Sequence, residues 1–257
     1  MKVKVTILGT GTSQGVPIIG CDCNVCQSDD ARDKRLRVSI LVQANGKNIV
    51  VDAGPDFRQQ MLRAGVQRLD AILLTHEHND HIIGIDDVRP FNFSQKEDIP
   101  VYAIDRVQKD LKIRFEYIFR ENKYPGTPSL VLHTINKEQP FEIAGVPIIP
   151  IEVMHGALPI LGYRFGDFTY ITDAFTIAPK EKEKIKGSKV LIINALHYHE
   201  HYSHLNVPQA LELLDELQPH RAYLTHISHY MGLAKEINQV LPPNVQLAFD
   251  TQIIDIE

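Results

Sequence analysis

Residues 71–84 read Ala-Ile-Leu-Leu-Thr-His-Glu-His-Asn-Asp-His-Ile-Ile-Gly. The four apolar residues at the start lack helical spacing, which predicts a short buried strand. Four potential metal ligands follow within six positions: His76, His78, Asp80 and His81. Extended backbone would point His76 and His78 to one side, and a helix is expected to begin near Ile82. Imidazole and carboxylate groups together suit Zn²⁺, Mn²⁺ or Fe²⁺. The stretch therefore predicts two adjacent metal sites, and the alternative is a solvated polar loop.

The motif His76-x-His78-x-Asp80-His81 resembles the signature of the metallo-β-lactamase superfamily of hydrolases. That resemblance implies an α/β fold of the αββα type, in which two β-sheets pack face to face and helices flank the sandwich. The order of predicted elements agrees with it, because a β-rich half precedes the metal motif and another follows. We expect a single domain over residues 1–257.

Composition is that of an ordinary globular protein, with 257 residues, 44% apolar and 23% charged. The net charge of −5 argues against binding of extended nucleic acid. No signal-peptide pattern opens the chain, and no apolar run approaches the ~20 residues of a membrane span. Three cysteines are an odd number and a poor disulfide framework, so we expect a cytoplasmic protein without membrane contact.

Hydrophobic periodicity and turn residues predict the secondary structure. Strands are expected at 3–8, 38–43, 48–51, 71–74, 100–103, 129–134, 141–143, 146–153, 162–165, 168–172, 190–194, 221–224, 245–249 and 252–256. Helices are expected at 57–64, 82–92, 106–119, 207–217 and 232–240. Asn45-Gly46 predicts a tight hairpin, and Asn206 is the expected N-cap of the helix over 207–217.

Three further candidate ligands each follow a predicted strand: His155, Asp173 and His226. Any one of them alone is more often a solvated turn residue. The family resemblance implies a shared role, with His76, His78 and His155 on a first metal. Asp80, His81 and His226 would hold a second metal, Asp173 would bridge the two, and Asp80 would also take part in catalysis. By the same resemblance, Asp52 orients a ligand histidine.

Two details separate this chain from other branches of the superfamily. Di-iron members that reduce oxygen carry Glu in place of the second motif histidine, whereas here Glu77 is an intervening residue and His78 keeps the ligand position. Zinc β-lactamases usually have Cys where Asp173 stands. Hydrolysis at a dinuclear site is the remaining interpretation.

The cysteines form the motif Cys21-x-Cys23-x-x-Cys26, which offers three thiolates to a structural zinc that needs a fourth ligand. His229, three residues after His226, is the candidate; the alternative is three buried free thiols. The combination resembles the PhnP-like phosphodiesterases of the carbon–phosphorus lyase pathway. The runs at 9–17 (Gly-Thr-Gly-Thr-Ser-Gln-Gly-Val-Pro) and 51–58 (Val-Asp-Ala-Gly-Pro-Asp-Phe-Arg) also match that subgroup.

The resemblance implies a phosphodiesterase that acts on a small, cyclic diester such as a ribosyl 1,2-cyclic phosphate. Two catalytic metals (Zn or Mn) would bridge the attacking hydroxide, and one structural zinc would complete the set. His204 matches the family's general acid. If the local register differs, His197, His199 or His201 would carry that role; the alternative for these three is a polar loop or strand edge. The alternatives are an RNase Z-like nuclease, a non-catalytic PqqB-like accessory protein, and a thioester or lactone hydrolase. Homodimer formation and a role in phosphonate metabolism are open.

Overall fold

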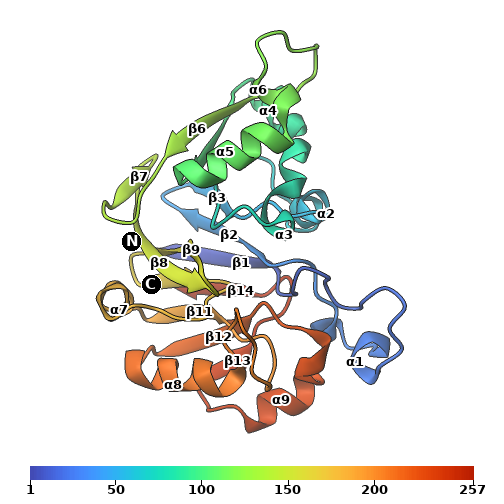
Figure 1. The fold of residues 1–257 in the computed structure, drawn as a ribbon, viewed down its shortest axis with the longest axis vertical. Helices are drawn as coiled ribbons and strands as arrows, with labels where there is room; N and C mark the ends of the chain where they lie inside the picture. Colours follow the sequence, from blue (N-terminus) through green and yellow to red (C-terminus); the bar gives the residue numbers. More distant parts are fainter.

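The computed structural model describes residues 1–257, and its strands form two seven-stranded sheets that face each other (Figure 1). The first sheet has the order β14-β1-β2-β3-β4-β5-β6, with bounds Ile253–Ile256, Val3–Gly9, Ser39–Ala44, Lys47–Val51, Ala71–Leu73, Ile99–Ala103 and Leu130–Thr134. The second has the order β13-β12-β11-β10-β9-β8-β7, with bounds Val245–Leu247, Arg221–Thr225, Val190–Asn194, Phe168–Ile171, Leu158–Phe165, Val146–His155 and Phe141–Ile143.

Both sheets are mixed in the same way. Strands β14, β1, β2 and β3 pair antiparallel and β3 to β6 pair parallel. In the second sheet β7 to β10 pair antiparallel and β10 to β13 pair parallel. Parallel strands end at the same edge of a sheet, so the loops that follow them lie side by side. The segments with the metal motif, Asp173 and His226 follow such strands, whereas His155 ends the antiparallel strand β8.

Helices cover the outer face of each sheet, which completes the αββα arrangement (Figure 1). The helices are α1 (Asn24–Gln27), α2 (Phe57–Arg63), α3 (Asn79–Ile82), α4 (Arg89–Gln95), α5 (Asp105–Arg114), α6 (Glu116–Phe119), α7 (Pro179–Ile185), α8 (Val207–Leu217) and α9 (Ala234–Val240), with 3₁₀ turns at Ala31–Asp33, Ile83–Val88 and His229–Met231. Apolar side chains fill three layers: one between the sheets, one under α2, α4 and α5, and one under α7, α8 and α9. The predicted fold class and the single domain are thus confirmed.

Three predicted helices differ from the structure. The helix expected over 82–92 is broken by a 3₁₀ turn, where the N–H of Gly84 donates to the Ala53 carbonyl oxygen at 2.9 Å. The backbones lie so close here that a side chain at Gly84 would clash with the carbonyl oxygen of Gly54. The helix expected over 106–119 is interrupted at Phe115, whose backbone leaves helical geometry (φ −114°, ψ 40°) while its side chain is buried. The helix expected from residue 232 begins at Ala234, since Gly232 has a φ of 99°.

Smaller differences concern element ends and short helices. Helix α2 ends at Arg63, one residue earlier than predicted, and β8 and β9 extend toward each other to His155 and Leu158. The sequence did not predict α1 or α7. The hairpin at Asn45-Gly46 is confirmed, with φ of 50° and 74°. No helix combines the length and apolar character that crossing a membrane would require.

Candidate metal centre

The site lies where the loops after β3, β4, β8, β10 and β12 converge. The metal motif follows β4, His155 ends β8, Asp173 follows β10, and His226 follows β12. Asp52, Asp173 and His226 have left-handed backbone conformations, with φ of 66°, 59° and 54°. Non-glycine residues rarely adopt such angles, which cost roughly 1–3 kcal/mol each and concentrate at functional sites. Three strained residues at one strand rim mark this rim as the candidate site.

The ligand atoms form two triplets, each with all its donor atoms within 4.8 Å of one another. One triplet is His76, His78 and His155, and the other is Asp80, His81 and His226. These are the two groups that the family resemblance implied. In the first triplet, His76 Nε2 lies 3.0 Å from His78 Nδ1, while His155 Nδ1 faces the Ser203 carbonyl oxygen at 2.9 Å. That contact leaves His155 Nε2 free to face the cluster.

Asp173 lies between the triplets. One of its oxygens is 3.4 Å from His81 Nε2 and the other is 3.1 Å from His226 Nε2. Ligand atoms of Asp173, His76 and His81 also lie within 4.8 Å of one another, and so do those of Asp173, His155 and His204. The two distances join Asp173 to the second triplet, and the groupings with His76 and with His155 place it close to the first, which is the position that a bridging ligand needs.

Asp52 is fully buried and is hydrogen-bonded to the segment that carries the metal motif. It accepts hydrogen bonds from Thr75 N at 2.8 Å and from Thr75 Oγ1 at 2.9 Å, and its Oδ2 lies 2.7 Å from His81 Nδ1. The second nitrogen of His81, Nε2, therefore points into the cluster. Metal-ligating histidines usually have such a partner on their other nitrogen. The Tyr163 hydroxyl adds a second support by donating to the Leu74 carbonyl oxygen at 2.6 Å.

The charged groups of the cluster favour the binding of cations. Burial alone would raise the pKa of Asp80 and Asp173, but the imidazoles of His81 and His226 hold the pKa of both carboxyls well below the usual range. Burial would lower the pKa of His81, yet the carboxylates of Asp80, Asp173 and Asp52 raise it well above its ordinary value. Burial lowers the pKa of His76. Metal ions would replace the proton on His81.

Several buried nitrogens in the cluster have no hydrogen-bond partner, namely His81 Nε2, His204 Nδ1, and both ring nitrogens of His226. Unpaired buried polar atoms are rare in folded proteins. Nitrogen and oxygen ligands ~2.0–2.2 Å from one zinc ion lie about 3.4 Å apart in tetrahedral geometry. The His81–Asp80, His81–Asp173 and His226–Asp173 separations of 3.3, 3.4 and 3.1 Å fit that spacing. The donor set thus fits divalent metal ions.

A second cluster joins the N-terminal loop to the segment after β12. His229 Nδ1 lies 3.3, 3.4 and 3.7 Å from the sulfurs of Cys21, Cys23 and Cys26. A zinc with sulfur at ~2.3 Å and nitrogen at ~2.0 Å places these atoms about 3.5 Å apart. The pKa of Cys23 is lowered to about 6, chiefly because its sulfur accepts from the Cys26 backbone N–H, whereas burial raises that of Cys26 to about 11. The four residues fit one tetrahedral zinc.

Residues of the two triplets and Asp173 form the floor of a cleft of about 450 Å³. The cleft is lined by Thr12, Ser13, Gln14, His78, Asp80, His155, Asp173, Leu196, His197, His201, Tyr202, Ser203, His204, His226, Ser228 and Tyr230. No lysine or arginine is among them. His204 is buried beside the floor, with Nδ1 3.8 Å from Asp173 Oδ1. Burial and the neighbouring His226 lower the pKa of His204 to about 2.

The sequence missed part of this lining. His197 and His201 lie on the cleft wall, although they were expected in a polar loop, and Tyr202 and Tyr230 join them. The signal that could have found them is the dense alternation of His and Tyr over residues 197–204. His199 is exposed and does not line the cleft.

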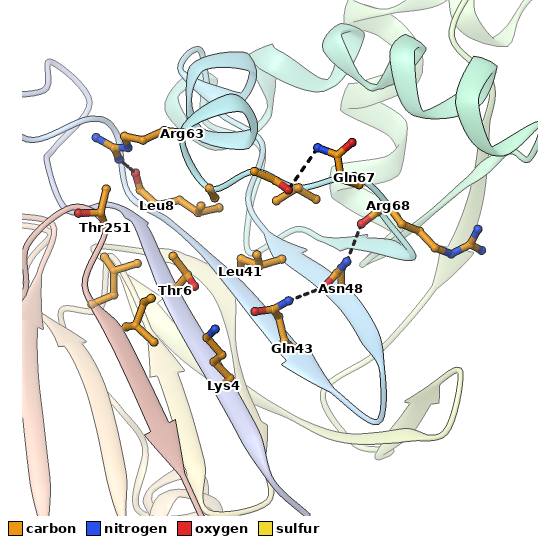
Figure 2. A pocket seen from close by; sticks show the side chains of 15 residues that line it. Lys4, Thr6, Leu8, Leu41, Gln43, Asn48, Arg63, Gln67, Arg68 and Thr251 are labelled. Atoms are coloured by element: carbon orange, nitrogen blue, oxygen red, sulfur yellow. Dashed lines mark hydrogen bonds between the residues drawn. The ribbon is translucent and has the colours of Figure 1, made fainter.

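A second cavity of about 480 Å³ lies on the outer face of the first sheet, beside β1, β2 and the end of α2 (Figure 2). Its two arginines have other partners: Arg63 pairs with Asp250, and Arg68 pairs with Asp70 and Glu97. It contains no group of metal-binding side chains. The metal cleft, not this cavity, is the candidate active site.

Comparison with known proteins defines the class. Residues 47–227 match the family model described as the beta-lactamase superfamily domain, and the chain belongs to this superfamily. Together with the two-sheet fold, this identifies it as a metal-dependent hydrolase of the metallo-β-lactamase fold.

Within the superfamily the chain is PhnP-like. The crystal structure of a diphosphatase from the PhnP family superposes with a TM-score of 0.93 and 39% identity, covering 100% of this chain and 98% of that one. Zinc-bound PqqB from Methylobacterium extorquens has a TM-score of 0.83 at 19% identity, covering 98% and 100%, which shows the shared fold alone.

A relative identified by sequence similarity is longer than this chain. The octanoyltransferase of Porphyromonas gingivalis is 43% identical over 250 residues, which are 96% of this chain and 50% of that protein. This chain therefore spans about half the length of that relative.

Proposed function

We propose that this protein hydrolyses a small phosphodiester at a dinuclear metal centre. The observation that carries the proposal is the pair of ligand triplets with Asp173 between them, at the floor of a cleft without lysine or arginine. In such a cleft the negative charge of a substrate can be neutralised only next to the metal floor. A substrate with one phosphate group at the floor satisfies that condition.

The residues divide into three roles. His76, His78 and His155 would hold one ion, Asp80, His81 and His226 the other, and Asp173 both; Asp52 orients His81. Zn²⁺ and Mn²⁺ both suit these donors. Two such ions, when bound, supply an activated water and neutralise phosphoryl charge. Asp80 and Asp173 contribute two negative charges, which lower the net charge of the metal site when the ions are bound.

His204 is the proposed proton donor to the leaving oxygen. It is the buried histidine that lines the cleft beyond the two triplets, and its ring centroid lies 4.6 Å from that of His155 and 4.7 Å from that of His226. As the P–O bond to the leaving alkoxide breaks, a proton from His204 would give the free alcohol. The lowered pKa keeps the ring neutral in the protein alone. The negative charge of a bound phosphate would therefore have to stabilise the protonated ring.

Cys21, Cys23, Cys26 and His229 would hold a structural zinc, because the protein supplies all four ligands and leaves no open position. This ion would fix the N-terminal loop, whose residues Thr12 to Gln14 line the cleft, to the segment after β12.

The first candidate substrate is a ribosyl cyclic phosphodiester, as the resemblance to the PhnP-like phosphodiesterases implies. A diphosphate diester is the second, because a diphosphatase of the PhnP family is 39% identical over the whole chain. An RNase Z-like activity is disfavoured by the lack of basic residues in the cleft, since nucleic-acid sites neutralise successive phosphates with Lys and Arg. Because the match to the octanoyltransferase covers half of that protein, acyl transfer is not carried over to this chain.

The test is a substrate panel on protein loaded with Zn²⁺ or Mn²⁺. It contains a ribose 1,2-cyclic phosphate, a nucleoside diphosphate diester, an aryl diester, a precursor tRNA and an acyl thioester. We expect turnover of the cyclic or the diphosphate diester, and a loss of roughly 10²–10⁴ in kcat for His204→Ala on alkyl leaving groups. An aryl leaving group needs no proton, so its hydrolysis should suffer less.

His133→Ala is the matched control, because His133 stacks on Tyr102 outside the cleft. Selective turnover of the thioester would refute the proposal in favour of acyl chemistry, and turnover of the tRNA alone would favour the nuclease. If nothing is turned over while both metals are bound, the PqqB-like accessory role replaces catalysis.

A further inference from the structure

Four aromatic rings form a continuous row along one side of the metal cleft. The ring centroids of Tyr202 and His201 are 4.5 Å apart, those of His201 and His197 are 6.2 Å apart, and those of His197 and Tyr230 are 6.2 Å apart. All four residues line the cleft. The row reaches the catalytic floor through His204, whose centroid is 5.1 Å from that of His201. We call these four residues the aromatic wall.

The two tyrosines of the aromatic wall are largely exposed, whereas His197 and His201 are half-buried. Tyr202 is 82% exposed and Tyr230 is 70% exposed, although the wall lies at the mouth of a buried polar centre. Large exposed aromatic residues beside a site frequently mark a binding surface. The wall is not a third metal site, because no three of its donors and those of His199 lie within 4.8 Å of one another.

The surrounding backbone fixes the wall relative to the metal floor. Leu196 N donates to Leu205 O at 3.0 Å and Val207 N donates to His197 O at 2.9 Å, so the histidine-rich loop is closed at its base. The carbonyl oxygen of Ser203 faces His155 Nδ1. Tyr230 follows His229 of the cysteine cluster directly, and its N–H donates to Ser228 Oγ at 3.2 Å. The wall is therefore preorganised rather than a free loop.

We propose that the aromatic wall stacks against a planar ring of the substrate, and that this ring is a nucleobase attached to the sugar whose phosphate lies on the metal floor. The inference rests on the proposed hydrolysis of a phosphodiester and narrows the substrate to a nucleoside phosphodiester. It excludes the ribosyl 1,2-cyclic phosphate, because C1 of that sugar carries the phosphate in place of a base. Aromatic faces accept any base, because every base presents a π-face. Hydroxyl groups of Thr12 and Ser13 line the same cleft and suit the ribose. The cleft volume of about 450 Å³ is within the range for small-molecule sites.

The experiment compares two substrates that differ only in the base. Adenosine 5′-phosphate methyl ester and ribose 5-phosphate methyl ester are assayed on the metal-loaded protein, and the ratio of their kcat/KM values is determined. Stacking contributes about 1–3 kcal/mol per base, which is a factor of roughly 5 to 150. We expect wild-type protein to favour the adenosine ester, and Tyr202→Leu or Tyr230→Leu to lower the ratio about tenfold, mainly through KM.

Tyr124→Leu is the control, because Tyr124 is 55% exposed and lies outside the cleft; it should keep the wild-type ratio. A wild-type ratio near one, or a ratio unchanged in both variants, would overturn the inference while the proposed function stands. If neither ester is turned over, binding of adenosine 5′-monophosphate is measured by calorimetry. Tenfold weaker binding of adenosine 5′-monophosphate by the two tyrosine variants would then support stacking on the aromatic wall, although the proposed function fails. Equal binding by all the proteins would overturn both the stacking inference and the proposed function.

Discussion

Asp52→Asn tests the support behind the metal loop. The carboxylate of Asp52 contacts Thr75 N, Thr75 Oγ1 and His81 Nδ1 at 2.7–2.9 Å, and it is fully buried. Asparagine has nearly the same shape and tolerates the left-handed backbone at this position. Its amide oxygen can still accept from Thr75, so the change removes mainly the charge-assisted bond to His81.

One such bond contributes about 1.5–3 kcal/mol. Removing the partner of a ligating histidine typically weakens metal binding 10- to 100-fold, which is about 1.4–2.8 kcal/mol. The two figures agree, so we expect the ion of the Asp80, His81 and His226 triplet to bind 10- to 100-fold more weakly. The cysteine cluster should keep its zinc with unchanged affinity and thus serves as an internal reference.

The assay is competition of the protein with a chromophoric zinc chelator at neutral pH, with the bound metals counted by elemental analysis. Asp250→Asn is the matched control: Asp250 is also a buried carboxylate, but its partners Thr10, Leu36 and Arg63 are not metal-ligand candidates. It should lower thermal stability without changing metal affinity. Wild-type affinity in Asp52→Asn, or equal weakening in Asp250→Asn, would refute the reasoning.

Three further predictions concern the rest of the molecule. Cys23→Ser should lose one zinc per chain and lower the melting temperature while two ions remain at the dinuclear centre; unchanged stoichiometry by elemental analysis would contradict the structural site. Tyr163→Phe should destabilise by about 1–3 kcal/mol in urea unfolding, because the buried Leu74 carbonyl loses its donor; an unchanged midpoint would show that this bond is dispensable. Arg32 lowers the pKa of Asp30 to about 2, so Asp30 binds fewer protons in the folded state than in the unfolded chain. Its stabilising contribution is therefore present above pH ~4 and disappears as the pH falls toward 2. Asp30→Asn should therefore lower the melting temperature at pH 5 more than at pH 3, and an equal difference at both values would exclude this ion pair as the cause.

Much of the fold follows from local signals. The strands around the metal motif were predictable, because an apolar run without helical spacing must be buried, and the hairpin at Asn45-Gly46 follows from the turn residues alone. The helix breaks were not predictable in this way. They arise where Gly84 meets the backbone of Gly54 and where Phe115 enters the core, and both contacts join residues that only the folded chain brings together.

The same division holds for the site. The spacing of His76, His78, Asp80 and His81 determined that this chain carries metal-binding chemistry, because ligand-type residues at that density after a buried strand are a local property of the sequence. The family resemblance indicated which distant residues to join to them. The aromatic wall had no such signal: Tyr202 and Tyr230 are 28 positions apart, and either alone is an ordinary surface tyrosine.

The sequence by itself thus determined the class of fold, the hydrolytic type of metal motif and the cysteine cluster. Only the tertiary structure shows that the cleft above the two triplets lacks lysine and arginine, and that its side is aromatic. The physical reason is the sheet topology. Strands far apart in the chain end at one rim, and the side chains that meet there are set by packing between the sheets rather than by neighbours in the sequence.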